Sequence, residues 1–417
     1  PGCVSGWADL SAKFGKLAFE DLMAPAIRYA REGYAVTPII AGYWSRAEER
    51  FGKFEEFAKV FLPEPKVGEI WKSEDHAQTL EDIAATKGES FYRGRLADKI
   101  AAAAKDAGAA MTADDLGSHE NIWYDETGLV SSEAFGARLF EIPPNTQGIA
   151  ATMAWGICGE IAGTLGDLDW HDPRGMHLQH EAMKLAFADL HAHVADADAM
   201  HFSPQVLVDP AYLAGRAKLV NADKAEVYAA GVPKDGGTIN LTTADDSGMM
   251  VSLIQSNFAG FGSGIVIPGT GIAMQNRGAG FVLDEGHPNE VGPSKRPFHT
   301  IIPGFVKVGG KPDLAFQLMG GPMQAQGHLQ MMLHIYAAGH DIQRAVDAPR
   351  WQITQGHELM IERGFDAAVI DDLKQRGHLI EERGFVNFGG AQMIRSHDNG
   401  VFSAASDPRK DGHAAGF

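Results

Sequence analysis

The character of the sequence changes at Thr238, where a series of short apolar segments begins. Gly, Pro and Asp separate these segments, which is typical of strands joined by turns. The segments are "TINLTTADD", "MMVSLIQSNF", "SGIVIPG", "GIAMQN", "FHTIIPGFVKV" and "DLAFQLMGG". Strands that follow one another without an intervening helix usually pair antiparallel. The sequence therefore predicts antiparallel sheet in this part of the chain.

Helical patterns stand on both sides of the strand-rich stretch. Apolar residues recur at helical spacing before it in "TQGIAATMAWGICGEIAGTL" and "GMHLQHEAMKLAFADLHAHVADADAM", and after it in "MQAQGHLQMMLHIYAAG" and "DAAVIDDLKQRG". Helices on both sides of a run of strands can cover both outer faces of the sheet. We therefore expect an α+β fold.

Single residues predict where several elements end. In the early helical segment "VSGWADLSAKFGKLAFEDLMAPAIRYAREGYAV" we expect breaks at Gly15 and Pro25. Thr112 is a candidate N-cap. "ARLFEIPP" reads as a strand that stops at Pro143, and Asp398-Asn399-Gly400 predicts a hairpin turn.

Composition excludes several classes of partner. The 417 residues carry a formal net charge of −18, so we expect neither nucleic acid nor an anionic membrane as partner. No apolar run approaches the roughly 18 residues of a membrane span. Two cysteines, Cys3 and Cys158, are too few for a disulfide framework. We see no signal peptide and favour the cytoplasm, with a periplasmic or secreted protein open if a signal segment precedes the sequence.

Two other features of the sequence suggest metal or nucleotide binding only weakly. Five histidines crowd one helical region: His177, His180, His191, His193 and His201. They match no zinc spacing, so we favour packed or solvated helix histidines over a metal site, with Asp189, Asp196 and Asp198 on the same solvated face. "GFGSGIVIPGTG" lacks the context of a nucleotide loop, and we expect turns there. We expect no metal and no cofactor.

"KDGGTINL" places Gly236-Gly237 directly before the threonine that opens the strand region. A turn before a strand explains this arrangement, and so does a self-cleavage site. Cleavage of the Gly237–Thr238 bond would give Thr238 a free α-amino group with a reference pKa of roughly 7.7–8.0. That amine is a base placed beside the hydroxyl it must deprotonate. Thr238 alone would then supply both nucleophile and base.

"LMGGPMQAQG" places Gly320-Gly321 between a predicted strand and a predicted helix. Neighbouring backbone N–H groups at a helix start can bind an anion. The pair is therefore a candidate oxyanion hole, and a tight strand-to-helix turn is the alternative.

These pieces together resemble the γ-glutamyltransferase family of N-terminal-nucleophile hydrolases. The resemblance covers nearly the whole chain in family order. It is carried by "PGCVSGWADLSAKFG", "EIPPNTQGIAATMAWGI", "DPAYLAGRAKLV", "GSGIVIPGTGIAMQNRGAGF", "GPSKRPFHTIIPGF", "MGGPMQAQGHLQ" and "SAASDPRKDGHAAGF". It implies a four-layer αββα sandwich built from a large fragment, residues 1–237, and a small fragment, residues 238–417, of one chain.

The resemblance also assigns roles to residues. Thr238 matches the autoprocessing and acyl-accepting threonine, with cleavage between Gly237 and Thr238. Ser256 matches a hydroxyl residue that orients the nucleophile, and Asn257 a substrate-contacting asparagine. Gly320 and Gly321 match the oxyanion-hole glycines. The implied partners are a small-molecule amide and the two fragments themselves, with a homodimer left open.

The sequence departs from the family pattern at the residues that bind the α-amino and α-carboxylate groups of a γ-glutamyl substrate. "QNRGAGF" has no carboxylate before Phe281, and "KRPFHT" puts His299 and Thr300 where the family has a serine pair. The family also uses an arginine upstream of the Pro-Gly segment, and this sequence begins at that segment. We therefore expect Arg277, Arg296, His299 and Thr300 to line the acyl site. The sequence leaves open γ-glutamyl, glutaryl-like and oxamate-like groups, and an unprocessed binding protein.

Overall fold

The computed structural model describes residues 1–166, 168–228 and 237–417. They form two compact units: Pro1–Trp123 with Ala259–Asn276 is unit 1, and Tyr124–Phe258 with Arg277–Phe417 is unit 2. The predicted fragment boundary at 237/238 falls within the sequence of unit 2. Residues 234–236 of the predicted cleavage segment lie outside the described residues. No helix of the described part is long and apolar enough to cross a bilayer.

Unit 2 is built on a six-stranded antiparallel sheet in the order β13-β12-β8-β7-β4-β3. Its strands are β3 (Val130–Ala134), β4 (Ala137–Glu141), β7 (Gly304–Val308), β8 (Lys311–Met319), β12 (Gly390–Ser396) and β13 (Phe402–Ser406). Five consecutive residues of β8, from 314 to 318, are buried. A strand that buries both alternating sets of side chains is covered on both faces.

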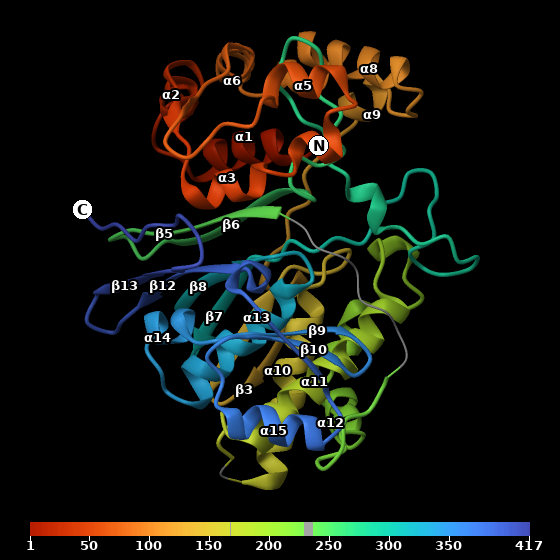
Figure 1. Cartoon of the computed structure of the whole chain (residues 1–417), viewed down its shortest axis with the longest axis vertical. Helices are drawn as coiled ribbons and strands as arrows, with labels where there is room; N and C mark the ends of the chain where they lie inside the picture. Colours follow the sequence, from red (N-terminus) through yellow and green to blue (C-terminus); the bar gives the residue numbers. More distant parts are fainter. Residues whose placement is uncertain (167, 229–236) are drawn as a thin grey trace. The chain divides into compact units, whose positions relative to one another are not determined.

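One face of this sheet carries the hairpin of β5 (Gly237–Ala244) and β6 (Met250–Phe258), which forms a second sheet (Figure 1). Gln317 of β8 joins the two layers, because its Nε2 donates to the carbonyl oxygens of Leu241 at 2.8 Å and Leu253 at 2.7 Å. A side chain between the sheets thus satisfies main-chain groups of both hairpin strands.

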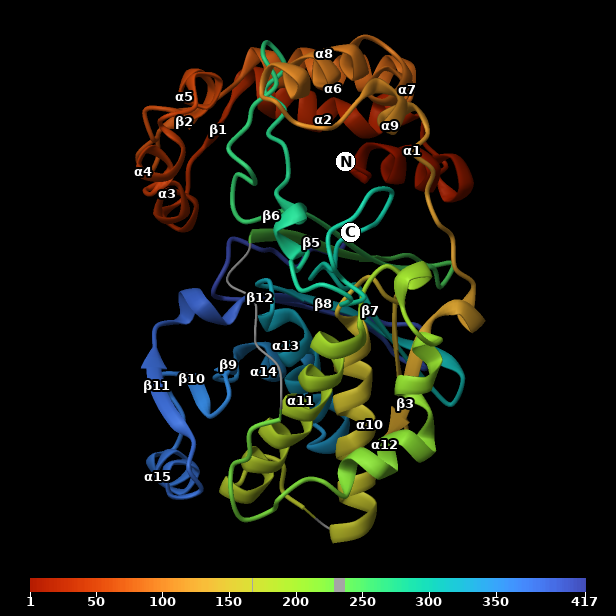
Figure 2. The ribbon, with the colours of Figure 1, turned by 90° about the vertical axis from the view of Figure 1, so that its right-hand side faces the viewer.

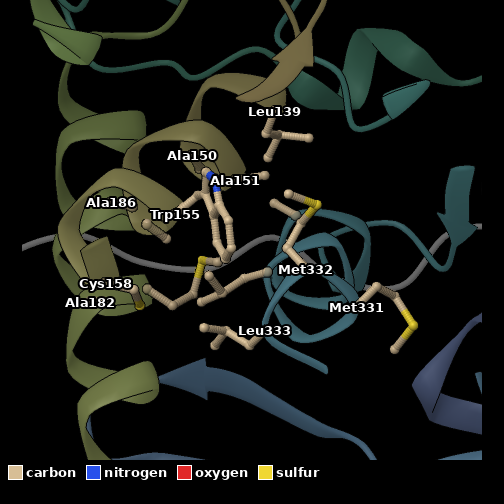
Figure 3. Packing of buried hydrophobic residues seen from close by; sticks show 14 of the residues in the cluster. Leu139, Ala150, Ala151, Trp155, Cys158, Ala182, Ala186, Met331, Met332 and Leu333 are labelled. Atoms are coloured by element: carbon tan, nitrogen blue, oxygen red, sulfur yellow. The ribbon is translucent and has the colours of Figure 1, made fainter. Parts of the chain in front are cut away.

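Helices cover the other face of the six-stranded sheet (Figures 1 and 2). They are α10 (Gly148–Leu165), α11 (Pro173–His193) and α13 (Met323–Met332). Trp155 of α10 is fully buried, and its Nε1 donates to the carbonyl oxygen of Ala137 at 3.2 Å. Figure 3 shows it packed with Ala150, Cys158, Met332 and Leu333. Unit 2 thus contains three consecutive layers: helices, six-stranded sheet and two-stranded sheet.

Unit 2 also contains a small sheet and three further helices. The sheet has the order β11-β10-β9, with β9 (Trp351–Gln355), β10 (Glu358–Glu362) and β11 (Leu379–Arg383). The helices are α12 (Pro210–Ala217), α14 (Ile342–Asp347) and α15 (Ala367–Gln375). Of these helices, α15 packs on the small sheet, α12 on α10, and α14 on β12 and β13. The family-like "SAASDPRKDG" segment holds a buried ion-pair network, in which Asp407 pairs with Arg350 and Arg409 pairs with Glu362.

Unit 1 is mainly helical. Its elements are α1 (Cys3–Phe14), α2 (Phe19–Glu32), β1 (Tyr34–Ala35), α3 (Pro38–Trp44), α4 (Ala47–Phe51), α5 (Glu55–Phe61), β2 (Ile70–Trp71), α6 (Glu74–Thr86), α7 (Glu89–Arg93), α8 (Arg95–Asp106) and α9 (Ala113–Gly117). Thr112 caps α9 in a capping box with Asp115, as the sequence predicts. The glycine-rich loop forms turns, with positive φ at Gly262 and Gly264.

The α+β fold class is confirmed, while three local expectations are wrong. Helix α2 continues through Pro25, because packing of α2 on α6 outweighs the single hydrogen bond that the proline removes. Residues 259–303 contain no named strand; only isolated bridges such as Val266 with Ala273 form there. Asp189 is buried and pairs with Arg216 at 2.9 Å, so it does not lie on a solvated face.

Candidate active site

Thr238 lies at an irregularity of the β5–β6 hairpin. Gly237 pairs with Phe258 and Ile239 pairs with Gln255, so the register shifts across Thr238. One residue of β5, Thr238, faces two residues of β6, Ser256 and Asn257, so the extra residue of this bulge is in β6. Here the Oγ1 of Thr238 donates a hydrogen bond of 3.2 Å to the Oγ of Ser256 in β6. The structure therefore joins two of the residues that the resemblance singles out.

The backbone beside Ser256 holds its hydroxyl in place. The N–H of Phe258 donates to Ser256 Oγ at 2.8 Å, and Phe258 has a φ of 75°, a rare value for a residue other than glycine. Ser256 Oγ thus accepts two hydrogen bonds, which uses both of its lone pairs. A strained turn at a strand end that fixes a hydroxyl is a feature of functional sites.

Gly320 and Gly321 form the turn from β8 to α13 with φ values of 137° and 59°. Both values lie in the region that favours glycine. A Cβ on Gly320 would lie 3.1 Å from Gly389 Cα and 3.2 Å from Met323 Cβ. In the described part of the chain, neither amide N–H donates a backbone hydrogen bond. Two adjacent donors at a helix start fit the predicted oxyanion hole.

Contacts between the sheets place Thr238 and Gly320 at the same end of unit 2. Gln317 bonds the carbonyl oxygen of Leu241, and the side chain of Asn240 donates to the carbonyl oxygen of Gly390 at 3.1 Å. Gly390 is the register partner of Met319, the residue before Gly320. The start of β5, where Thr238 lies, is therefore at the same end of the two sheets as the end of β8, which Gly320 follows.

Gln147 is a site residue that sequence reasoning did not single out. Its fully buried Nε2 donates to the carbonyl oxygens of Thr300 at 2.6 Å and Gly321 at 2.8 Å. The side chain thereby ties the glycine turn to the segment that follows Phe298. The "PPNTQG" stretch that contains Gln147 stands out in the sequence. Its spacing does not indicate contacts with Thr300 and Gly321, which lie more than 150 positions away.

Arg277 and Thr300 meet, as expected for a shared acyl site. Arg277 Nη1 donates to Thr300 Oγ1 at 3.0 Å, and its guanidinium carbon lies 5.0 Å from the centre of the Phe258 ring. Phe258 also bonds Ser256, so these contacts lead from Arg277 to the Thr238 pair. Burial lowers the pKa of Arg277 to about 10, and the side chain is therefore a cation at neutral pH.

His299 is neutral and lies near two cations. Burial, and after it the charges of Arg277 and Arg296, lower the pKa of His299 to about 3. Its backbone pairs with the 145–147 segment, because its N–H donates to the carbonyl oxygen of Asn145 at 3.0 Å. Arg296 is exposed, and its N–H donates to Asp196 at 2.7 Å. The role of Arg296 in acyl binding stays a prediction.

Asn257 lies in β6 between Ser256 and Phe258 and is half-buried. Ser256 and Asn257 are the two β6 residues of the bulge, where the regular alternation of side chains between the faces is interrupted. Its predicted contact with substrate stays a prediction.

Comparison with known proteins identifies the family. Residues 1–417 match the Gamma-glutamyltranspeptidase family. The chain belongs to this family. It is an enzyme of the amide-hydrolysing and acyl-transferring kind that the family comprises.

Relatives within the γ-glutamyltranspeptidase family differ in the substrates that their names give. The chain is 31% identical to the glutathione hydrolase-like YwrD proenzyme of Bacillus subtilis, covering 100% of this chain and 80% of that protein. It is 32% identical to the oxamate amidohydrolase proenzyme of Klebsiella pneumoniae, again covering 100% and 80%.

A solved structure in this family has the same fold. The cephalosporin acylase from Bacillus halodurans superposes with a TM-score of 0.93 at 41% identity, covering 100% of this chain and 77% of that one. The predicted N-terminal-nucleophile fold is thereby confirmed. The substrates named for the relatives differ, so the substrate of this chain must be inferred from its own site residues.

Proposed function

We propose that the chain is a self-processing amidohydrolase that carries its acyl group on Thr238. The observation that carries the proposal is the 3.2 Å hydrogen bond from Thr238 Oγ1 to Ser256 Oγ, beside the bulge of β6. The amide donors of Gly320 and Gly321, at the same end of the sheets, support it. The name "proenzyme" of the relatives agrees with self-processing.

In the processing step, the Thr238 hydroxyl attacks the carbonyl carbon of Gly237. The C–N bond between the two residues breaks, and the acyl group of Gly237 passes to the threonine oxygen as an ester. Water then hydrolyses the ester, leaving a carboxylate on Gly237 and a free α-amino group on Thr238. This amine is the general base of the mature enzyme.

In turnover, Thr238 Oγ1 attacks the substrate carbonyl carbon while the α-amino group takes the hydroxyl proton. The N–H groups of Gly320 and Gly321 stabilise the oxyanion, and one such donor typically contributes about 10²–10³ in rate. The proton passes to the leaving amine as the C–N bond breaks. Water then attacks the Thr238 ester and releases the acid; we expect water as acceptor more than an amine.

The acyl group that the site favours is acidic and lacks an α-amino group. Arg277 is a half-buried cation bonded to Thr300, and His299 nearby is neutral. "GAGF" offers no carboxylate at 278–280 to pair with an ammonium group. Glutaryl-like and oxamate-like amides fit such a site, and the relatives named cephalosporin acylase and oxamate amidohydrolase agree with them. A γ-glutamyl group is the second candidate, supported by the glutathione hydrolase relatives.

Processing is tested by the intact mass and N-terminal sequence of the purified protein. We expect two fragments, the smaller beginning Thr-Ile-Asn-Leu, and a single uncut chain for Thr238→Ala. Wild-type protein that stays uncut after prolonged incubation would exclude the proposal and favour a binding protein.

The acyl group is tested with two substrates that differ in one group, glutaryl-p-nitroanilide and L-γ-glutamyl-p-nitroanilide. Their only difference is the α-amino group, so the ratio of kcat/KM reports recognition of that amine. We expect the glutaryl substrate to be preferred, and oxamate to be tested alongside by ammonia release. A strong preference for the γ-glutamyl substrate would select the second candidate.

A further inference from the structure

Three histidines of unit 2 line one cavity outside the candidate active site. The cavity has a volume of about 810 Å³, and none of the residues that line it belongs to that site. His171, His334 and His340 each present a ring nitrogen, and these nitrogens lie within 4.8 Å of one another. The set shares no residue with the α11 histidines that the sequence singled out.

An irregular helix end brings two of these histidines together. The end of α13 widens into a π-turn at Leu333–Ala337, closed by a bond from the Ala338 N–H to the Leu333 carbonyl oxygen. Gly339, with a φ of 69°, then reverses the chain. His340 lies against His334, and their Nδ1 atoms form a hydrogen bond of 3.1 Å, which a metal ion bound to these atoms would replace. Single π-turns in α-helices often occur at functional sites.

His171 approaches the pair from the loop before α11. Its N–H is held by Asp169 Oδ1 at 2.8 Å, and its ring centre lies 4.2 Å from that of His334. The Nε2 of His171 is buried without a hydrogen-bond partner among the described residues. A buried ring nitrogen without a partner, on a histidine that packs against two others, calls for an explanation, and an absent ligand is one.

We propose that His171, His334 and His340 bind a divalent transition-metal ion, with Zn²⁺ as the representative case. Neutral imidazoles are preferred ligands of such ions, and a three-histidine site leaves one position open to water or a small ligand from the cavity. The ion would join the loop before α11 to the end of α13 and to the chain after it.

The geometry needs side-chain rotation but no change of fold. Two nitrogens bound to one Zn²⁺ at about 2.1 Å each are at most about 4.2 Å apart. The rings of His171 and His334 are stacked at 20°, so one must turn for its lone pair to meet the ion. The open cavity beside them gives room for that turn.

The charges around the cavity suit a cation. Among the described residues, Asp169, Asp347 and Asp366 line it together with the guanidinium of Arg344. The three aspartates and the one arginine give the residues that line the cavity a net negative charge, which favours binding of a divalent cation.

A second cluster in the same unit provides a contrast. His177, Glu181 and His378 are buried close together, and their ring nitrogens and carboxylate oxygens have protein partners except for His378 Nδ1. Glu181 accepts from Lys184 Nζ at 2.7 Å and from the Glu226 N–H at 3.1 Å. His177 bonds His378 at 2.9 Å and the Asn221 carbonyl oxygen at 2.7 Å. Because both ring nitrogens of His177 and both carboxylate oxygens of Glu181 are engaged, that cluster carries no metal proposal.

The test is a calorimetric titration of the EDTA-treated, dialysed, untagged full chain with ZnCl₂. We expect one Zn²⁺ per chain, and at least about tenfold weaker binding in His340→Ala and in His171→Ala. Both replaced side chains are partly exposed, and circular dichroism checks their folding. The control is His201→Ala, an exposed histidine outside the cavity, which should bind as the wild type does.

Cobalt provides a second readout, because visible absorption of bound Co²⁺ reports nitrogen ligands in a low-symmetry site. That absorption should appear in wild type and His201→Ala and be lost in both cavity variants. Absence of stoichiometric binding, or equal binding in wild type and both cavity variants, would overturn the proposal. Neither result bears on the cleavage of Gly237–Thr238, which is read independently by intact mass.

Discussion

The hydroxyl of Thr238 lies 3.2 Å from the hydroxyl of Ser256, across a bulge that interrupts the β5–β6 register at Thr238. A regular ladder would pair these strands without a shift, and successive side chains would alternate between the faces. The register of Ile239 with Gln255, continued by one residue, places Thr238 opposite Ser256, and the extra residue of the bulge follows in β6. This relationship makes the hairpin the scaffold of the proposed nucleophile.

Replacing Ser256 by Ala should slow both self-cleavage and turnover. The variant removes the acceptor of the Thr238 hydroxyl and of the Phe258 N–H. Loss of positioning of this kind costs about 10- to 100-fold in kcat. Intact mass against time and steady-state kinetics measure the two effects. Ser247→Ala, in the exposed turn of the same hairpin, is the control, and an equal loss there would show that the effect is not specific to Ser256.

Replacing Gly320 by Ala should lower kcat and stability together. The new Cβ meets Gly389 and Met323 at a φ of 137°, which costs about 1–3 kcal/mol in the free energy of unfolding. Displacing one oxyanion donor costs about 10²–10³ in kcat. Gly163→Ala is the matched control: its Cβ has open space in α10, and it should stabilise the protein by about 0.5–1 kcal/mol. Full activity of Gly320→Ala would remove this turn from the mechanism.

Replacing Gln147 by Leu should lower the stability of the protein and displace the Gly320-Gly321 turn, because the Gln147 side chain holds this turn. Two buried carbonyl oxygens, on Thr300 and Gly321, lose their donor, and each unsatisfied group costs about 1–3 kcal/mol. Urea unfolding should show the loss of stability, and kinetics should show a lower kcat. Gln375→Leu, at the exposed end of α15, should change neither. A variant that is destabilised but fully active would mean that Gln147 only supports the fold.

Replacing Arg277 by Met should raise KM for an acidic acyl substrate. The charge-assisted bond it would make is worth about 1.5–3 kcal/mol, or roughly 10- to 150-fold in binding. Arg296→Met serves as the comparison, because Arg296 is exposed and its removal should have the smaller effect. Unchanged KM for glutaryl-p-nitroanilide in Arg277→Met would show that Arg277 does not bind the acyl group.

The folded chain should lose stability as the pH falls from about 6.5 toward 4. Burial lowers the pKa of His191 to about 4 and, aided by neighbouring cations, that of His299 to about 3. The unfolded chain takes up protons near pH 6.5, where these folded histidines do not. The lowered folded pKa values therefore favour the native state above pH 6.5, and this contribution shrinks below it. Tm measured against pH should fall less steeply in His191→Gln than in wild type; identical slopes would show that His191 does not contribute to the acid sensitivity.

The order of helices and strands could be predicted because it depends on local patterns. Alternating apolar residues after Thr238 gave β5, β6 and β8, and the helical spacing before them gave α10 and α11. The wrong expectations lie where tertiary contacts outweigh local preference. Pro25 is carried inside α2 by packing, and the apolar stretches around Val266 and Ala273 form only an isolated bridge.

The sequence by itself determined the candidate nucleophile, the glycine pair and the absence of a carboxylate before Phe281, because these depend on residue types in order along the chain. Only the tertiary structure decided that Thr238 reaches Ser256, that Gln147 holds Gly321, and that His171 meets His334 and His340. These contacts join segments far apart in the sequence. They are set by sheet register, by a bulge and by a π-turn, whose positions follow from packing of the whole unit rather than from local preference.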